Sequence, residues 1–307
     1  MAEFKIKEQY LTDNHPQKHY LPNFIAHVIY VVTCYYFFDW MCGLLDVENM
    51  NKNQVYFQFT FPFILAILAV INIIYTFVYW IEHPAIEARK ITTTPWLWKS
   101  DPVFWKKMLP DLIYTYIRNF AFFGVFAYFV LTYFVAPNYN LADRPSFLKH
   151  FLHIYISTFM EDFIFYWSHR LLHLPWFYKR VHKQHHFTAD IMHLNCIYTH
   201  WFEFLVGNIL PFLGGLFVCG NSMHVITFMT WSFYRIIETH EVHCGYEMPV
   251  SIFPVFPFST NATYHNFHHF KNVGNYATFF TFWDDIFGTN KYYNEAISDL
   301  QKKEKAN

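Results

Sequence analysis

The sequence is poor in charged residues, which make up 15% of its 307 residues, whereas ordinary soluble domains contain about 25%. Hydrophobic residues make up 54%, so the charges are too few to cover a water-soluble globule, and we expect a membrane protein. The 38 Phe, 23 Tyr and 10 Trp exclude a disordered chain, because disordered chains contain few aromatic residues. No nucleic acid partner is expected either, since 22 Lys and Arg are balanced by 23 Asp and Glu.

Several motifs of common metal and cofactor sites are also absent. The five cysteines form no CxxC pair, so neither a thiolate zinc site nor a disulfide framework is predicted, and a reducing compartment fits best. Because GxGxxG does not occur, electrons for any redox reaction must come from outside the chain. HExxH is missing as well, since the segment His240-Glu241-Val242-His243 is one residue too short. The Glu-x-x-His motif of carboxylate di-iron bundles does not occur.

Long apolar windows predict the fold. A helix needs about 20 apolar residues to cross about 30 Å of hydrocarbon. Windows of this kind predict three membrane spans and a weaker fourth: Phe24–Leu45, Phe57–Trp80, Leu112–Val135 and Phe151–Trp167. Two shorter stretches, Phe204–Cys219 and Met223–Ile237, predict a hairpin that enters the bilayer without fully crossing it. We therefore expect an all-α, polytopic membrane protein with about four transmembrane helices and a cytosolic, His-rich helical cap that holds a di-metal site.

Basic residues predict the orientation, because cytosolic loops are enriched in Lys and Arg. The loop after the first span contains Lys52 alone, whereas the loop after the second contains five basic residues: Arg89, Lys90, Lys99, Lys106 and Lys107. The second loop, the His-rich part and both termini should then be cytosolic. The lysines three and five from the end, Lys305 and Lys303, resemble a dilysine signal for retrieval to the endoplasmic reticulum, although a solvated charged tail fits equally well.

Histidine is unusually frequent and clustered. Of the 19 His, 15 lie between His150 and His269, and eight of these form three tight motifs. The motifs are HRLLH at His169–His173, HKQHH at His182–His186 and HNFHH at His265–His269. On a helix, residues four apart share one face, so each motif directs at least two imidazoles toward the same point.

These motifs predict two metal ions. Imidazole binds Fe, Zn, Cu and Ni, and a zinc ion takes three or four protein ligands. Eight or more His are therefore too many for one ion. Iron is the metal whose open positions support O2 chemistry on unactivated C–H bonds.

Two acidic residues, Glu161 and Asp162, lie in the fourth apolar window shortly before the first His motif. Charged groups are costly inside a bilayer. A position at the membrane interface and a role in the metal site are both compatible with the sequence.

The three His motifs, followed by GNYATFFTFWDDIFGT, resemble those of the membrane-bound fatty acid hydroxylase and sterol desaturase superfamily. The block ETHEVHCGYEMP at Glu238–Pro249 is similar to that of the C4-methylsterol monooxygenase branch, with Cys244 where Ser is usual. THWFE, from Thr199, stands where that branch has His-Pro-x-x-Glu, with Trp201 in place of Pro. The resemblance divides the chain into N-terminal transmembrane helices at 1–150, a fatty acid hydroxylase-type domain at 151–290 and a cytosolic tail at 291–307.

The resemblance implies a set of metal ligands. Eight come from the three motifs and two from outside them: His169, His173, His182, His185, His186, His265, His268, His269, His200 and His243. His240 is an additional candidate that is equally compatible with a bystander. Metal-bound His usually donates its other N–H to a carboxylate or a carbonyl, and four acids are placed to accept it: Glu203, Glu238, Asp284 and Asp285.

The resemblance also implies the reaction. It implies two iron ions, O2 as co-substrate, and electrons from an external NAD(P)H-dependent chain, with cytochrome b5 and its reductase docking near Arg170, Lys179, Arg180 and Lys183. The substrate would be a membrane lipid or sterol, oxidised at a C4 methyl group in sterol biosynthesis, in the endoplasmic reticulum membrane. Two alternatives stay open. One is a fatty acyl or sphingolipid hydroxylase or a sterol desaturase, and the other is a structural subunit of a larger membrane complex.

Overall fold

The computed structural model describes residues 6–12, 20–188 and 191–306. The parts of the predicted N-terminal segment at 1–5 and 13–19, and the last residue of the dilysine-like tail, Asn307, lie outside these ranges. Within them the regular elements are helices, and the β-type pairings are isolated bridges such as Lys90 with Tyr246. The all-α prediction is confirmed.

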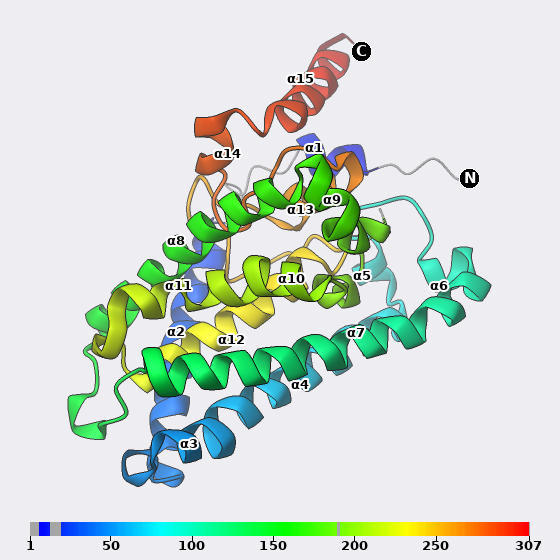
Figure 1. Cartoon of the computed structure of the whole chain (residues 1–307). Helices are drawn as coiled ribbons and strands as arrows, with labels where there is room; N and C mark the ends of the chain where they lie inside the picture. The colour runs from blue at the N-terminus through cyan, green and yellow to red at the C-terminus, as the bar shows by residue number, and fades with distance from the viewer. Residues whose placement is uncertain (1–5, 13–19, 189–190, 307) are drawn as a thin grey trace.

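Six helices run along the molecule. These helices are α2 (Tyr20–Leu44), α4 (Phe61–Ile81), α7 (Pro102–Phe129), α8 (Phe147–Leu172), α11 (Leu210–Cys219) and α12 (Val225–Val242). Three of them are extended by π-helical turns, at Val55–Thr60 before α4, at Val130–Phe134 after α7 and at Leu205–Ile209 before α11. α12 lies in the middle of the bundle, in contact with α2, α4, α8 and α11, and 13 of its 18 residues are buried (Figure 1).

Shorter helices occupy the ends of the bundle. They are α1 (Glu8–Thr12), α3 (Lys52–Gln54), α5 (Pro84–Glu87), α6 (Leu97–Ser100), α9 (Pro175–Arg180), α10 (Trp201–Phe204), α13 (Ala262–Lys271), α14 (Phe282–Phe287) and α15 (Lys291–Ala306). Turns of 3-10 helix lie at Val47–Asn49, Leu141–Asp143, His182–Phe187, His193–Ile197 and Gly220–Ser222. Several helices begin at a side chain that accepts a backbone N–H, as Asp101 does for α7, Ser146 for α8 and Asn261 for α13.

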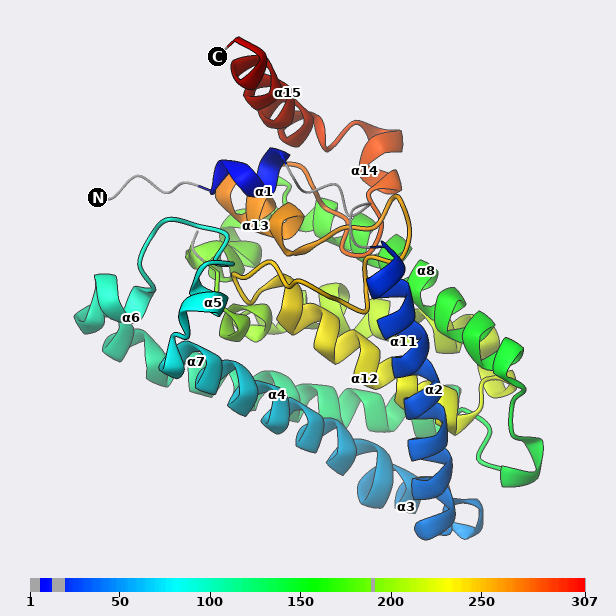
Figure 2. The ribbon, with the colours of Figure 1, turned by 180° about the vertical axis from the view of Figure 1, so that it is seen from behind.

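The chain turns back at two opposite ends. At one end, Asn138, which follows α7, donates to the carbonyl of Met223, which precedes α12 (2.7 Å). At the other end lie α5, α6, α9, α13 and α14, and we call this the histidine end because it carries the three His motifs. Both terminal helices, α1 and α15, contact each other at the histidine end (Figures 1 and 2). The second loop, the His motifs and the terminal helices thus lie at one end of the bundle, as the predicted orientation requires.

Four segments are long and apolar enough to cross a membrane. They are Tyr20–Leu44, Lys52–Ile81, Pro102–Phe134 and Trp201–Ser222. The first three contain most of each of the predicted windows, but the fourth corrects the sequence-based assignment. Phe151–Trp167 is part of α8. Within the described chain, α8 is not apolar enough to count as a membrane span. It carries His150, His153, Glu161 and Asp162, and all four are buried. Instead, the stretch Phe204–Cys219 is continuous with α10, and together they reach the length of a span.

Close packing of α11 against α8 positions the helix that carries the first His motif. A Cβ atom placed on Gly215 would lie 2.1 Å from the Ser157 hydroxyl oxygen and 2.5 Å from the Ser157 Cα. Small residues allow such close approach of helices in membranes, where packing replaces the hydrophobic effect as the driving force. A larger residue at position 215 would collide with the backbone of α8, which cannot move aside as a flexible side chain could.

We expect Gly215→Leu to destabilise the fold by about 1–3 kcal/mol or more, because the added side chain must push α11 away from α8. The matched control is Gly43→Leu, since a Cβ on Gly43 of α2 would have no heavy atom within 4 Å. Thermal unfolding of the detergent-solubilised proteins compares them. Equal melting temperatures for the two variants would contradict this account of the interface.

Candidate metal centre

Four elements deliver the His motifs to one place at the histidine end. The last turn of α8 carries His169, and His173 directly follows this helix; α13 carries the third motif, and His243 directly follows α12. The second motif forms 3-10 turns with a kink at His186 (φ −82°, ψ 19°). Nine of the predicted ligands converge there in two groups.

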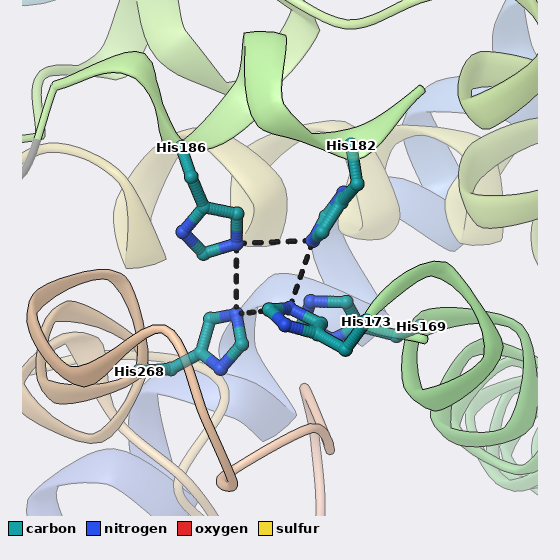
Figure 3. Close-up of side chains that lie close together, drawn as sticks. All are labelled: His169, His173, His182, His186 and His268. Carbon is teal, nitrogen blue, oxygen red and sulfur yellow. Dashed lines mark hydrogen bonds between the residues drawn. The ribbon is translucent and has the colours of Figure 1, made fainter. Parts of the chain in front are cut away.

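The first group contains five imidazoles: His169, His173, His182, His186 and His268. Four of them form a closed ring through their Nε2 atoms (Figure 3). The Nε2 of His182 lies 2.9 Å from that of His173 and 3.0 Å from that of His186. The Nε2 of His268 lies 3.2 Å from that of His173 and 3.1 Å from that of His186. We call this the five-histidine group.

The second group contains His185, His243, His265 and His269, and we call it the four-histidine group. Nε2 of His243 lies 3.4 Å from that of His185 and 3.0 Å from that of His265. The two groups adjoin, since the ring centres of His186 and His269 are 4.4 Å apart. Each HxxHH motif divides its three imidazoles between the groups: the first and third stay together, and the middle one, His185 or His268, joins the other group.

The outward-facing nitrogens determine where the ring protons are. Nδ1 of His268 donates to the Gly274 carbonyl (2.6 Å) and Nδ1 of His169 to the Tyr276 carbonyl (2.8 Å). In the four-histidine group, Nδ1 of His185 donates to the Asn195 carbonyl (3.2 Å) and Nδ1 of His243 to the Thr239 carbonyl (2.8 Å). A carbonyl is only an acceptor, so each of these nitrogens carries the proton, and the inward Nε2 carries a lone pair.

These lone pairs require a cation between the rings. The Nε2 atoms of His185 and His243 face each other with no proton available to either. In the ring of Figure 3, Nδ1 of His182 lies 2.8 Å from a Glu203 carboxylate oxygen and therefore carries the ring proton. Because Nδ1 of His268 carries its proton as well, only His173 and His186 can supply protons for the four Nε2–Nε2 contacts. Imidazole nitrogens bind zinc at about 2.0–2.1 Å, so two such ligands at a right angle would be about 2.9 Å apart. The observed separations fit a first-row metal ion in each group.

Burial keeps the imidazoles in the neutral form that binds metal. Eight of the nine are buried, and the ninth, His173, is partly buried. Burial lowers the pKa of His169 to about 4 and that of His243 to about 3. Burial, followed by repulsion from neighbouring rings, also lowers the pKa of the His182, His186 and His268 imidazoles well below 6.5. The rings are therefore unprotonated at neutral pH.

A loop held by Asp284 supplies two of the carbonyls. The Asp284 carboxylate accepts hydrogen bonds from the backbone of Tyr276 (2.9 Å) and Ala277 (3.0 Å), and from Tyr264 and Thr289. Gly274 has φ +78°, and a Cβ there would lie 2.2 Å from the Thr289 carbonyl oxygen. Asp284 thus acts on the imidazoles through the backbone and not by direct contact. This role of Gly274 and Tyr276 was not predicted, because a backbone carbonyl leaves no signal in the residue type.

Glu161 and Asp162 belong to the support of the site and not to the membrane interface. Glu161 and Glu238 both bind the guanidinium of Arg235, with the Glu238 contact at 2.9 Å. Asp162 accepts from the backbone N–H groups of Thr278 (3.1 Å) and Phe279 (2.7 Å). All three carboxylates are buried, and each has partners. Asp285, by contrast, bonds to Thr281 and Asn290 and lies away from the rings.

Two candidate ligands lie outside both groups. The ring of His200 accepts from the backbone N–H of Phe202 (3.2 Å) at the start of α10. His240 donates from Nδ1 to the Ile236 carbonyl (2.8 Å), and its Nε2 lies 3.5 Å from the Asn72 amide. The structure therefore brings together nine of the ten predicted ligands and leaves His200 and the additional candidate His240 apart from them.

Two cavities adjoin at the site. One, the apolar cavity, lies between α4, α7, the π-helical turn and α12, and its wall includes Leu68, Phe120, Phe123 and Phe212. The other, the histidine cavity, touches both His groups. Asn208, Arg235 and Thr239 line both cavities. An apolar cavity between the helices thus adjoins the cavity that the imidazoles line.

Comparison with known proteins gives the family of this part of the chain. Residues 154–289 match the family model of fatty acid hydroxylase, and this range contains both His groups. No solved structure matches the chain. Residues 154–289 are therefore similar to the fatty acid hydroxylase family, which agrees with the resemblance of the His motifs.

Three relatives illustrate the range of the family. Methylsterol monooxygenase 2-2 of Arabidopsis thaliana is 39% identical over 155 residues, 48% of this chain and 56% of the relative. Fatty acid hydroxylase domain-containing protein 2 of Homo sapiens is 41% identical over 115 residues, 37% of this chain and 34% of the relative. Very-long-chain aldehyde decarbonylase GL1-11 of Oryza sativa subsp. indica is 38% identical over 143 residues, 45% and 52% of the two chains. The chain thus spans about half, or less, of the length of these relatives.

We expect Glu203→Gln to weaken metal binding to the five-histidine group by about 10–100-fold, because the carboxylate beside His182 orients the ring and favours its Nδ1–H form. Metal titration of the chelator-treated full chain measures this affinity. The matched control is Glu295→Gln, which removes an exposed carboxylate 3.8 Å from Lys291 on α15. Unchanged affinity in Glu203→Gln would show that Glu203 does not support the ligand.

Proposed function

We propose that this protein is a membrane-bound di-iron enzyme that uses O2 to hydroxylate a lipid C–H bond, with a C4-methylsterol as substrate. The observation that carries the proposal is the adjacency of two buried His groups, whose facing lone pairs require cations, to an apolar cavity between spanning helices. The methylsterol monooxygenases among the relatives support the choice of lipid.

Iron is proposed on the donor set. The nine clustered imidazoles would divide into five and four ligands, more than two zinc ions take. Bound iron would supply the activation of O2 that no side chain can supply. His200 and His240 lie outside both groups. Either residue would become a metal ligand only if its side chain moved toward one of the groups.

The chain's own residues position the reaction. The carbonyls of Gly274, Tyr276, Asn195 and Thr239 fix the orientation of four rings, so that their Nε2 atoms stay directed inward. The apolar cavity would hold the lipid with its reactive carbon toward the histidine cavity. Its Phe and Ile lining would exclude water, which protects the oxidised carbon from competing reactions.

Electrons would reach the site from the histidine end. Cytochrome b5 and its NAD(P)H-dependent reductase are the proposed donors, and the exposed residues Lys179, Arg180 and Lys183, with the partly exposed Arg170, offer the basic surface for docking. The proposal places this end in the cytosol, with the protein in the endoplasmic reticulum membrane. The common position of α1, α15 and the basic second loop at this end supports that orientation.

Another lipid oxidation is the second candidate function. The similarity to very-long-chain aldehyde decarbonylases favours it, since the name of these relatives gives a different lipid as substrate. Fatty acyl or sphingolipid hydroxylation and sterol desaturation belong to the same group of alternatives. A structural subunit of a larger complex is disfavoured, because nine converging imidazoles in an apolar bundle would be costly without a bound ion.

We expect the purified protein to contain about two iron ions per chain and, in nanodiscs with cytochrome b5, its reductase and NADH, to consume O2 when a 4-methylsterol is added. Metal analysis and mass spectrometry of the sterol measure the two results. Oxidation of fatty acyl lipids alone would contradict the proposed substrate. A metal-free protein prepared without chelators would favour the structural alternative.

His185→Ala should abolish this turnover, because it removes one of four ligands of the four-histidine group. The folded state should survive, and thermal unfolding in detergent measures it. His83→Ala, at the exposed start of α5, is the matched control and should retain full activity. Turnover retained in His185→Ala would refute the ligand role.

A further inference from the structure

The point at which the apolar cavity meets the histidine cavity is polar. We call Asn208, Arg235 and Thr239 the neck, because these three residues line both cavities. The remaining wall of the apolar cavity is almost entirely Ile, Leu and Phe, with His240 as the other polar residue. A lipid that reaches the imidazoles must therefore pass or contact the neck.

The guanidinium of Arg235 is already engaged. Its Nε binds Glu161 and its Nη1 binds Glu238 (2.9 Å), so its charge is compensated within the protein. This leaves the Asn208 amide and the Thr239 hydroxyl as the neck groups that face the cavities without such partners.

Neither side chain has a hydrogen-bond partner among the described residues. On the same helix as Thr239, the hydroxyls of Thr230 and Ser232 donate to the carbonyls one turn earlier, at 2.9 and 2.7 Å. Thr239 makes no such bond, and both it and Asn208 are partly exposed to the cavities. Asn208 is also part of a candidate membrane span, where an unpartnered amide is costly.

The backbone around Asn208 also departs from a regular α-helix. The π-helical turn Leu205–Ile209 interrupts the helix that runs from Trp201 to Cys219. Single π-helical turns inside longer helices are frequent at functional sites. Here the interrupted segment contains the one amide that lines both cavities.

We propose that Asn208 and Thr239 bind an oxygen substituent of the lipid, a hydroxyl or a carbonyl, located within a few bonds of the carbon that is oxidised. The inference rests on the proposed function and specifies its substrate class. An amide and a hydroxyl each offer both a donor and an acceptor. The neck adjoins the imidazoles, since the Thr239 carbonyl accepts from Nδ1 of His243 (2.8 Å). A substituent held at the neck therefore holds the neighbouring carbon beside the His groups, and the rest of the lipid occupies the apolar cavity.

Equilibrium binding tests the proposal without turnover. The full chain in nanodiscs is titrated with a 4-methylsterol that carries its 3-hydroxyl group and with the 3-deoxy analogue. Wild-type protein should bind the hydroxylated sterol more tightly. Asn208→Leu and Thr239→Val should each weaken that binding by about 2- to 10-fold, the range expected for one neutral hydrogen bond, and leave the deoxy analogue unchanged. Thr230→Val, which removes a hydroxyl that faces its own helix, should change neither.

Steady-state turnover of the same pair separates this inference from the proposed function. We expect the variants to raise KM for the hydroxylated sterol more than they lower kcat, with metal content unchanged. If sterol is oxidised but both neck variants still prefer the hydroxyl group as wild type does, the inference is wrong and the function stands. If hydroxyl-dependent binding is lost in the variants but wild type oxidises no sterol, the neck is confirmed and the proposed reaction fails.

Discussion

The structure depends on one electrostatic constraint. Unprotonated imidazole nitrogens face one another in the interior, away from water. His185 and His243 each donate their ring proton outward to a carbonyl, so only lone pairs remain between them. Such an arrangement is repulsive unless a cation lies between the rings. The low pKa of the buried rings excludes the other solution, which is protonation. A metal ion bound between the rings would remove this repulsion.

The elements around the rings can be understood as supports for that constraint. Each inward nitrogen needs an outward acceptor, and most acceptors belong to backbone segments that need their own anchors. Asp284 holds the loop that presents the Gly274 and Tyr276 carbonyls, and Asp162 holds its continuation at Thr278 and Phe279. These carboxylates are buried but each accepts several N–H groups, which offsets part of the cost of burial. The acids inside the apolar helices are therefore explained by the metal centre.

Sequence predicted the residues that meet but not how they divide. Helical spacing brings His182 and His186 together, yet it does not show that His185 joins another group, because that depends on a kink at His186. His243 was found through the family resemblance, whereas the Gly274 carbonyl has no signature in residue type. The fourth span was misplaced because α8 has no window that is apolar enough for a span. Its His and acidic residues, which are buried in the bundle, lower the mean hydropathy of Phe151–Trp167.

The two adjoining cavities place an apolar space beside the two His groups. Close packing of α11 on α8 fixes the position of this segment, since a Cβ on Gly215 would meet the Ser157 backbone about three turns of α8 before His169. The π-helical turn before α11 opens the wall toward α7 and α12. The same chain segment, Trp201–Ser222, therefore packs against α8 and lines the apolar cavity. Glu203 belongs to this segment, and its carboxylate contacts the imidazole of His182. A shift of this span would alter lipid access and ligand orientation together, so the two are coupled by covalent continuity.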